Sequence, residues 1–212
     1  MITTRNSKKY SGLHFTVNHT GKMEGLESLS TSCAINTRCM RNALIEGSIC
    51  SKCYASAQLK RYKNMNSPLE NNARILSSII PKVLLPTITV QMFRFESFGD
   101  LMCRNQVINY FNICKANPNV NFALWTKNPD IIASAIREGN TKPENLNIIV
   151  SSLFINQISP CKHDFIDKIF TVYSKDYIEE HNVEINCGAR SCFECRKCYE
   201  KNDIRHISEK LK

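Results

Sequence analysis

The chain has 212 residues, which is long enough to bury a sizeable hydrophobic core without covalent cross-links. Lys and Arg outnumber Asp and Glu by 28 to 19, and the net charge of +9 would favour an anionic partner, nucleic acid included, although basic residues spread along the chain fit a solvated basic surface better. The N-terminal stretch is polar, and no run approaches the about 18 apolar residues that a membrane span needs. The composition therefore predicts a cytoplasmic protein with no membrane partner.

Predicted strands and helices alternate along the chain. Residues 67–80 predict a helix, with Ser67 as its N-cap and Pro68 at its first position. The β-branched and aromatic residues after Pro86 predict a strand. The predicted strands are 25–31, 87–95, 119–126, 145–154, 168–174 and 183–186. The predicted helices are 67–80, 104–116, 130–139 and 175–181, and the basic residues 200–212 are also helix-like.

This alternation predicts an α/β fold in which parallel strands are joined by helical crossovers. Apolar runs such as residues 148–154 suit strands that are buried on both faces. An open parallel sheet and a partial (β/α)6 barrel both fit the order, and in either fold functional residues gather at the carboxyl ends of the strands. No composition shift marks a second domain, so residues 1–212 are expected to form one α/β domain with cysteine-rich segments at 30–55 and 186–199.

Eight of the 11 cysteines fall into two groups of four. In a reducing compartment such groups indicate a metal site more often than disulfides, and four thiolates suit either zinc or a [4Fe–4S] cluster. The run from Cys192 to Cys198 repeats Cys-x2-Cys, which resembles ferredoxins and favours iron–sulfur over zinc. The metal ligands predicted are Cys33, Cys39, Cys50 and Cys53 in the first group, and Cys187, Cys192, Cys195 and Cys198 in the second. The isolated Cys103, Cys114 and Cys161 are expected to be small buried apolar residues.

Polar residues at predicted strand ends are the candidates for catalysis. Glu96 and Asp100 flank a turn after the second predicted strand, where a carboxylate can bind an amine or act as a base. The alternative is that the pair caps the following helix. Lys127, after the third strand, could meet an anion or remain in solvent.

The sequence contains, in this order, GKMEGLESLSTSC, CSKCYA, FRFESFGDL and NPNVNFALWTK, followed by the terminal cysteine cluster. Together these motifs resemble the phage gene product eighty-eight family of cysteine-rich, radical-SAM-like iron–sulfur proteins. The resemblance implies a phage or prophage origin, and hence the host cell cytoplasm. It places Cys33, Cys39, Cys50 and Cys53 at a first metal site, Tyr54 beside it, and Gly99, Asp100, Thr126 and Lys127 in a pocket. One turn departs from the family pattern, because it reads Phe-Gly-Asp-Leu instead of Ser-Gly-Asp-Phe.

A radical-SAM likeness would imply S-adenosylmethionine as a cofactor. Such enzymes hold a [4Fe–4S] cluster with three cysteines in C-x3-C-x2-C, which leaves one iron open. Here the spacing is Cys39-x10-Cys50-x2-Cys53, with Cys33 as a fourth candidate, and four ligands would close the cluster. No Gly-Gly-Glu-Pro stretch is present, and ESFGD stands at the equivalent strand end.

The leading hypothesis is an iron–sulfur protein with one or two [4Fe–4S] clusters, acting in electron transfer or redox chemistry with an unknown redox partner or small-molecule substrate. The alternative is a zinc-stabilised protein that binds nucleic acid through its positive charge. The basic residues cluster only at 58–63 and 195–201. Thiol–disulfide exchange at a Cys-x2-Cys pair is a third possibility, but it leaves the remaining cysteines unexplained.

Overall fold

The computed structural model describes residues 12–211, and all of its strands belong to one seven-stranded sheet of order β1-β2-β3-β4-β5-β6-β7. The strands are β1 Thr16–Val17, β2 Glu27–Leu29, β3 Met92–Phe95, β4 Asn121–Thr126, β5 Leu146–Ser151, β6 Lys168–Tyr173 and β7 His206–Lys210. Only β1 pairs antiparallel with its neighbour, and the pairs from β2 to β7 are parallel. The predicted α/β class is therefore confirmed, and the sheet is open because β1 and β7 do not pair.

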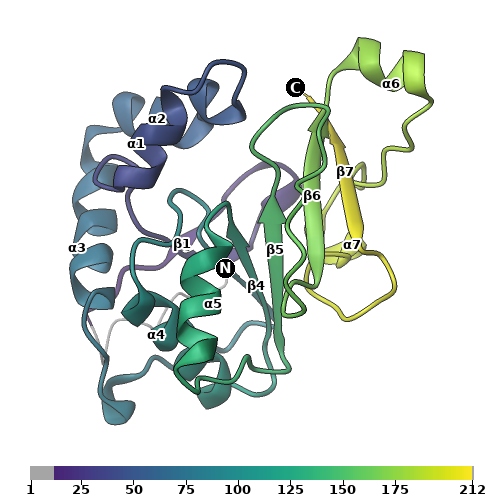
Figure 1. Cartoon of the computed structure of the whole chain (residues 1–212). Coiled ribbons are helices and arrows are strands. Elements are labelled where there is room, and N and C mark those ends of the chain that lie inside the picture. Colours follow the sequence, from purple (N-terminus) through teal and green to yellow (C-terminus); the bar gives the residue numbers. More distant parts are fainter. Residues whose placement is uncertain (1–11, 212) are drawn as a thin grey trace.

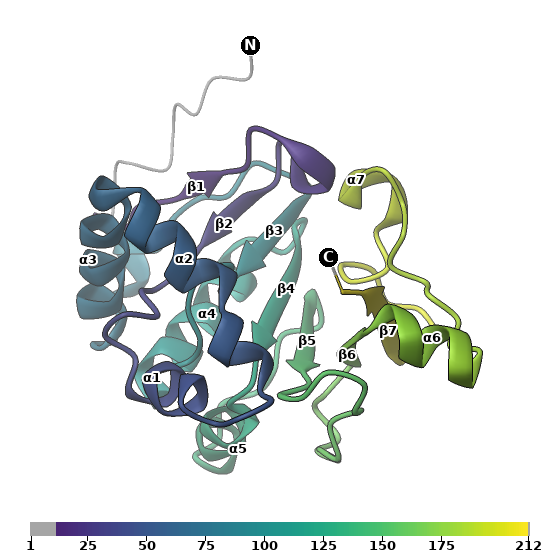
Figure 2. The same ribbon diagram turned by 90° about the horizontal axis from the view of Figure 1, so that it is seen from above.

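The helices occupy mainly one side of the sheet. They are α1 Thr37–Ala43, α2 Tyr54–Arg61, α3 Asn66–Leu76, α4 Arg104–Ala116, α5 Pro129–Arg137, α6 Lys175–His181 and α7 Cys192–Cys195. Seen from above, the sheet curves, with α1 to α5 outside the curve and the α7 segment inside it (Figure 2). At the upper end of β5 in Figure 1, where its arrowhead lies, the chain also carries α1 and α2. The carboxyl ends of the strands thus face the first cysteine-rich segment.

Two predicted elements are wrong. Residues 183–186 form no strand, and the last strand is β7, within the segment that was expected to be helix-like. Residues of β7 alternate between the two faces, and Ile207 is buried while Lys210 is exposed. Residues 206–210 pair in parallel with residues 169–173 of β6, so the backbone groups of this segment are satisfied by the sheet. The α3 helix begins at Asn66, so Ser67 lies inside its first turn and is not the N-cap.

The main hydrophobic core lies between the sheet and the helices. Phe95 is fully buried, and its ring stacks between Tyr110 of α4 and Phe122 of β4, with centroid distances of 4.1 and 5.3 Å. Phe93 meets both Phe95 and Phe122 edge-on. These aromatic contacts fix β3 and β4 against α4, and therefore fix the loops at the ends of both strands.

The other sheet face carries a second, smaller core. Met92, Ala123 and Ile149 pack there with Tyr199 of the C-terminal cysteine-rich segment. Asn147 of β5 donates its side-chain amide to the carbonyls of Cys198 and Glu200, at 3.0 Å each. The second cysteine-rich segment is therefore packed on the inner face of the sheet.

Replacing Phe95 with alanine should lower the free energy of unfolding by about 3–5 kcal/mol, because the change removes a fully buried ring that stacks on two others. Urea denaturation followed by circular dichroism measures the change. Val83→Ala is the matched control, since Val83 is 82% exposed and should change stability by less than about 0.5 kcal/mol. Equal midpoints for Phe95→Ala and the unchanged protein would contradict this description of the core.

Among residues 12–211, no helix has the length and apolar character needed to cross a membrane.

Candidate functional site

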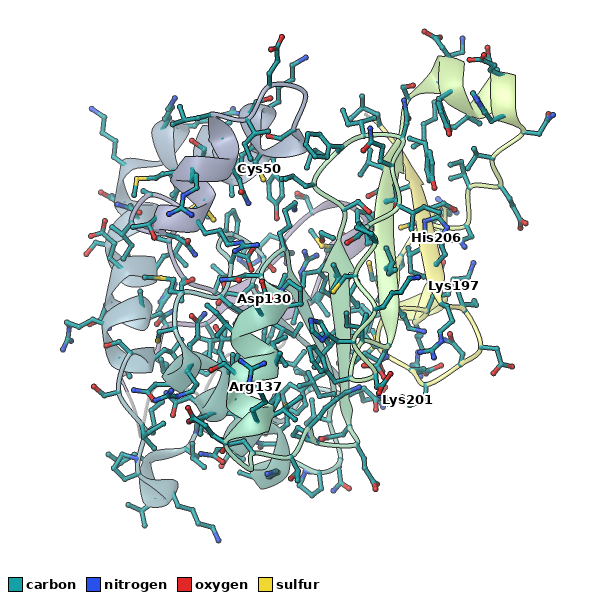
Figure 3. All side chains as sticks on the ribbon, in the orientation of Figure 1. Cys50, Asp130, Arg137, Lys197, Lys201 and His206 are labelled. Carbon is teal, nitrogen blue, oxygen red and sulfur yellow. The ribbon has the colours of Figure 1, made fainter. Side chains whose placement is uncertain are left out.

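The first four cysteines lie together at the carboxyl ends of β2, β3 and β4, and we call them the N-terminal cysteine group (Cys33, Cys39, Cys50 and Cys53). Cys33 follows β2 and Cys39 lies in α1, whereas Cys50 lies in the short 3₁₀ helix Ile49–Lys52. Cys53 is the residue before α2. Figure 3 labels Cys50 at this upper end of the molecule, beside α1 and α2.

Polar side chains hold these helices in place. The side-chain oxygen Oδ1 of Asn36 accepts hydrogen bonds from the backbone N–H groups of Arg38 and Cys39, at 3.0 and 3.2 Å, and so caps α1. The same Asn36 amide donates to the Asp100 carbonyl at 2.9 Å. Ile49 donates its backbone N–H to the Leu153 carbonyl at 2.9 Å. The segment that carries the cysteines is thus tied to the loops after β3 and β5.

Cys53 is the thiol most easily ionised in this group. A hydrogen bond from the Cys33 thiol, together with the backbone N–H groups of Ser56 and Ala55, lowers the pKa of Cys53 to about 6 against the opposing effect of burial. The charge of Lys127 contributes in the same direction. That hydrogen bond and burial raise the pKa of Cys33. The start of α2 therefore stabilises one thiolate.

The other two thiols complete the neighbourhood. Burial raises the pKa of Cys39, and the nearby Asp100 and Cys50 raise it further. Burial also raises the pKa of Cys50, with Lys127 opposing and Cys53 adding to the shift. Each thiol is thus an electrostatic neighbour of at least one other member, as the predicted first group requires.

Glu96 lies beneath this group and ties three elements together. Its carboxylate accepts hydrogen bonds from the Thr31 backbone N–H and hydroxyl, from Gln106, and from the Tyr110 hydroxyl. Burial raises its pKa to about 7, although the Tyr110 and Thr31 hydrogen bonds oppose the shift. Glu96 adopts a positive φ of 58°, which is rare for a non-glycine residue. These bonds show a structural role, and its predicted catalytic role stays a prediction.

Asp100 connects the loop after β3 with the loop after β4. It accepts hydrogen bonds from the Thr126 hydroxyl and from the backbone N–H groups of Lys127 and Leu101, the last two at 2.9 and 2.7 Å. Burial raises the pKa of Asp100. The structure therefore brings Asp100, Thr126 and Lys127 together, as the sequence predicted. The catalytic role of Asp100 is untested by this arrangement.

Gly99 and Tyr54 also belong to this site. A Cβ atom on Gly99 would lie 2.5 Å from the Thr31 hydroxyl oxygen, 2.6 Å from the Thr31 carbonyl oxygen and 2.7 Å from Glu96 Oε2, so only glycine fits. Tyr54 donates its hydroxyl to the Ser97 carbonyl, and its ring packs near Phe98. All of the predicted pocket residues therefore converge on one edge of the sheet.

The C-terminal cysteine group (Cys187, Cys192, Cys195 and Cys198) lies over the inner sheet face and apart from that edge. Burial raises the pKa of Cys198 to about 12, and the other three thiols of the group add to the shift. Lys22 donates to the Cys187 sulfur at 3.3 Å and to Glu209 of β7. Tyr199 packs against Trp125, with ring centroids 5.9 Å apart. The second group is thus held by contacts with both ends of the described chain.

A short repeat links the two groups. Cys50 to Tyr54 reads Cys-Ser-Lys-Cys-Tyr, and Cys195 to Tyr199 reads Cys-Arg-Lys-Cys-Tyr. In each case the tyrosine that follows the last cysteine packs against another aromatic ring, Phe98 for Tyr54 and Trp125 for Tyr199. The Cys-x-Lys-Cys-Tyr repeat is visible in the sequence, and it marks Tyr199 as the counterpart of Tyr54.

The basic residues of the predicted 195–201 cluster are bound within the protein. Lys201 pairs with Asp167 at 2.7 Å and Arg196 with Glu200 at 3.2 Å, while Lys197 donates to the Asn186 carbonyl at 2.8 Å. Figure 3 labels Lys197 and Lys201 on the β7 side of the molecule. These contacts leave less of the positive charge available to a nucleic acid.

Among residues 12–211, no three His, Cys, Asp or Glu side chains converge closely enough to form a metal-binding set. The chemistry of the two cysteine groups nevertheless fits a thiophilic metal, since each offers four thiols, which are the preferred ligands of zinc and of iron–sulfur clusters. Holding such a metal would require the thiols to turn toward a common centre. The predicted metal ligands therefore stay a prediction.

The comparisons with known proteins agree with the resemblance seen in the motifs. A family model described as Gene product 88 matches residues 2–212. No curated protein and no solved structure matches the chain. Because the family match includes both cysteine groups and every residue of the strand-end site, the chain belongs to the gene product 88 family.

Proposed function

We propose that this protein is an iron–sulfur protein that acts in electron transfer or redox chemistry, and that it is of phage or prophage origin. The N-terminal and C-terminal cysteine groups would each hold one [4Fe–4S] cluster. The observation that carries the proposal is the gathering of eight thiols into two groups of four, each with a cation beside it. Lys127 is the cation beside the N-terminal cysteine group, and Lys22 is the cation beside the C-terminal cysteine group.

The charge around the thiols supports this assignment. A [4Fe–4S] cluster with four thiolate ligands is an anion, and its potential depends on net charge, hydrogen bonds to sulfur and exposure. Lys127 favours the thiolate forms of Cys50 and Cys53. The N–H groups of Ala55 and Ser56 already point at the Cys53 sulfur. The lysine and the backbone N–H groups around the N-terminal cysteine group would compensate the negative charge of such a cluster, which a surrounding without polar groups would not do.

When bound, each cluster would supply a site that accepts or releases one electron. The protein's own residues would supply the ligands, the neighbouring cations and the exclusion of water. Four thiols in the first group would occupy all four irons, so S-adenosylmethionine fits this ligand set only if one of the four is not a ligand. Sequential parallel strands with helices outside a curved, open sheet are the features that support a radical-SAM-like core.

The test is metal and acid-labile sulfide analysis of the full chain purified without oxygen. We expect a brown protein with iron and sulfide in equal amounts. Cys50→Ser and Cys195→Ser should each lose part of the iron, because each variant removes one ligand from a different group. Cys103→Ser is the matched control and should keep all of the iron, since Cys103 precedes α4 outside both groups.

Stoichiometric zinc without sulfide would overturn the iron–sulfur assignment and would support two structural zinc sites instead. Equal iron content in all three variants would show that neither group holds the metal. Nucleic-acid binding, the alternative raised by the net charge, would then be tested by its dependence on salt concentration.

A further inference from the structure

Arg94 is a cation on the inner face of the sheet, and it has no anionic partner among the residues that the structure describes. It lies in β3 between Phe93 and Phe95, whose rings face the helix-side core, so its own side chain points to the opposite face. There the guanidinium lies over the ring of Trp125, 4.1 Å from the ring centroid. This stacking holds the plane of the guanidinium on a rigid strand.

The hydrogen-bonding capacity of Arg94 is almost unused. Its Nη1 donates to the Met23 sulfur at 3.3 Å, which is a weak acceptor, and its buried Nε has no partner. Among residues 12–211, no acidic side chain forms an ion pair with Arg94. A partly buried guanidinium with free donors is costly unless an anion meets it.

Arg94 also lies near both cysteine groups. On one side, Trp125, which lies beneath the Arg94 guanidinium, packs against Tyr199 of the C-terminal cysteine-rich segment. Trp125, Cys192 and Cys198 also pack against the same cluster on the inner sheet face. The tyrosine that closes the second Cys-x-Lys-Cys-Tyr repeat is therefore linked to Arg94 through Trp125, and the tyrosine that closes the first is bonded to Ser97, just beyond the end of the same strand. A second unpaired buried polar atom, Ser97 Oγ, lies three residues further along the chain, where Tyr54 bonds the Ser97 carbonyl.

We infer that Arg94, stacked on Trp125, is the binding site for an oxyanion group, a carboxylate or a phosphate, of a small-molecule substrate on the inner face of the sheet. A guanidinium matches both groups with two parallel hydrogen bonds, which a single ammonium does not. The inference does not depend on which metal the cysteines hold.

The test is calorimetric titration of the full chain, purified without oxygen, with inorganic phosphate and, in a separate arm, with acetate at constant ionic strength. We expect saturable binding of at least one of the two anions. Trp125 is the only tryptophan of the chain, so its fluorescence should change over the same concentration range. The arm that binds more tightly identifies the oxyanion that Arg94 prefers.

Arg94→Met should weaken the binding at least about tenfold, because it keeps the apolar stem and removes the charged donors. Arg61→Met is the matched control, since Arg61 also lies over an aromatic ring, that of Tyr62, but lies outside the site. If circular dichroism shows that Arg94→Met does not fold, Arg94→Lys replaces it, and the lost second hydrogen bond should still weaken binding.

Absence of saturable binding in the unchanged protein would overturn the inference, and so would equal affinities for it and the Arg94 variant. Metal analysis of the same preparation keeps this result separate from the iron–sulfur proposal. If a preparation without iron binds phosphate or acetate, the result contradicts the iron–sulfur proposal and leaves the assignment of Arg94 intact.

Discussion

Trypsin should cut the Cys195→Ser protein at Arg196 and Lys197 at least about tenfold faster than the intact protein, while the fragment that carries β3 to β6 persists. The α7 helix has only four residues, and no side chain in it is buried, so it has little stability of its own. Metal binding free energy in such a segment is folding free energy, and each 1.4 kcal/mol that is lost raises the open population about tenfold.

Cys161→Ser is the matched control for this experiment, because Cys161 lies in the loop before β6 and belongs to neither group. Timed digestion under anaerobic conditions, followed by mass spectrometry, assigns each cut. Equal cleavage rates at Lys197 in Cys195→Ser and the intact protein would mean that the second group is not a structural metal site.

Gly99→Ala should lower the free energy of unfolding by about 1–3 kcal/mol or more, because the new methyl group would overlap Thr31 and Glu96. One of the three contacts is to the backbone carbonyl of Thr31, so a side-chain rotation cannot relieve it. Thr31 lies two residues before Cys33, and the strain should also disturb the first cysteine group. For a chain of this length, the melting temperature should fall by about 2–4 °C for each kcal/mol.

Thermal unfolding measures the first effect, and iron analysis of the same preparation measures the second. Gly188→Ala is the control, since a Cβ there meets no atom within 4 Å. If Gly99→Ala and Gly188→Ala melt at the same temperature within error, the turn at Gly99 can accommodate a methyl group, which would contradict the close contacts described here.

Strong local signals explain which elements the sequence predicted. The α4 and α6 helices have the predicted bounds, 104–116 and 175–181, because both combine helical spacing of apolar or charged residues with a clear stop. The α1 and α2 helices were not predicted, since they are short, polar and stabilised by contacts such as that of Asn36 with Asp100. The β7 strand is an edge strand rich in charge, and its alternation is short.

The candidate site was predictable for a different reason. Parallel strands bring their carboxyl ends to one edge, so Glu96, Asp100 and Lys127 could be grouped without knowledge of the fold's details. Arg94 was not predictable in this way. Its role depends on which sheet face the helices leave open, and on Trp125 lying beneath it, and both facts come from the tertiary packing.

The backbone along β7 has a consequence for solubility. An open sheet offers two edges to other chains, and such edges promote aggregation unless they are short or covered. Here β1 has two residues, and the N–H groups of Asn186 and Cys187 are bonded to the Ser208 carbonyl of β7. Cys187, the first residue of the C-terminal cysteine group, thus also covers part of the β7 edge of the sheet. If this segment detached, β7 would be an exposed edge strand that could pair with strands of other molecules.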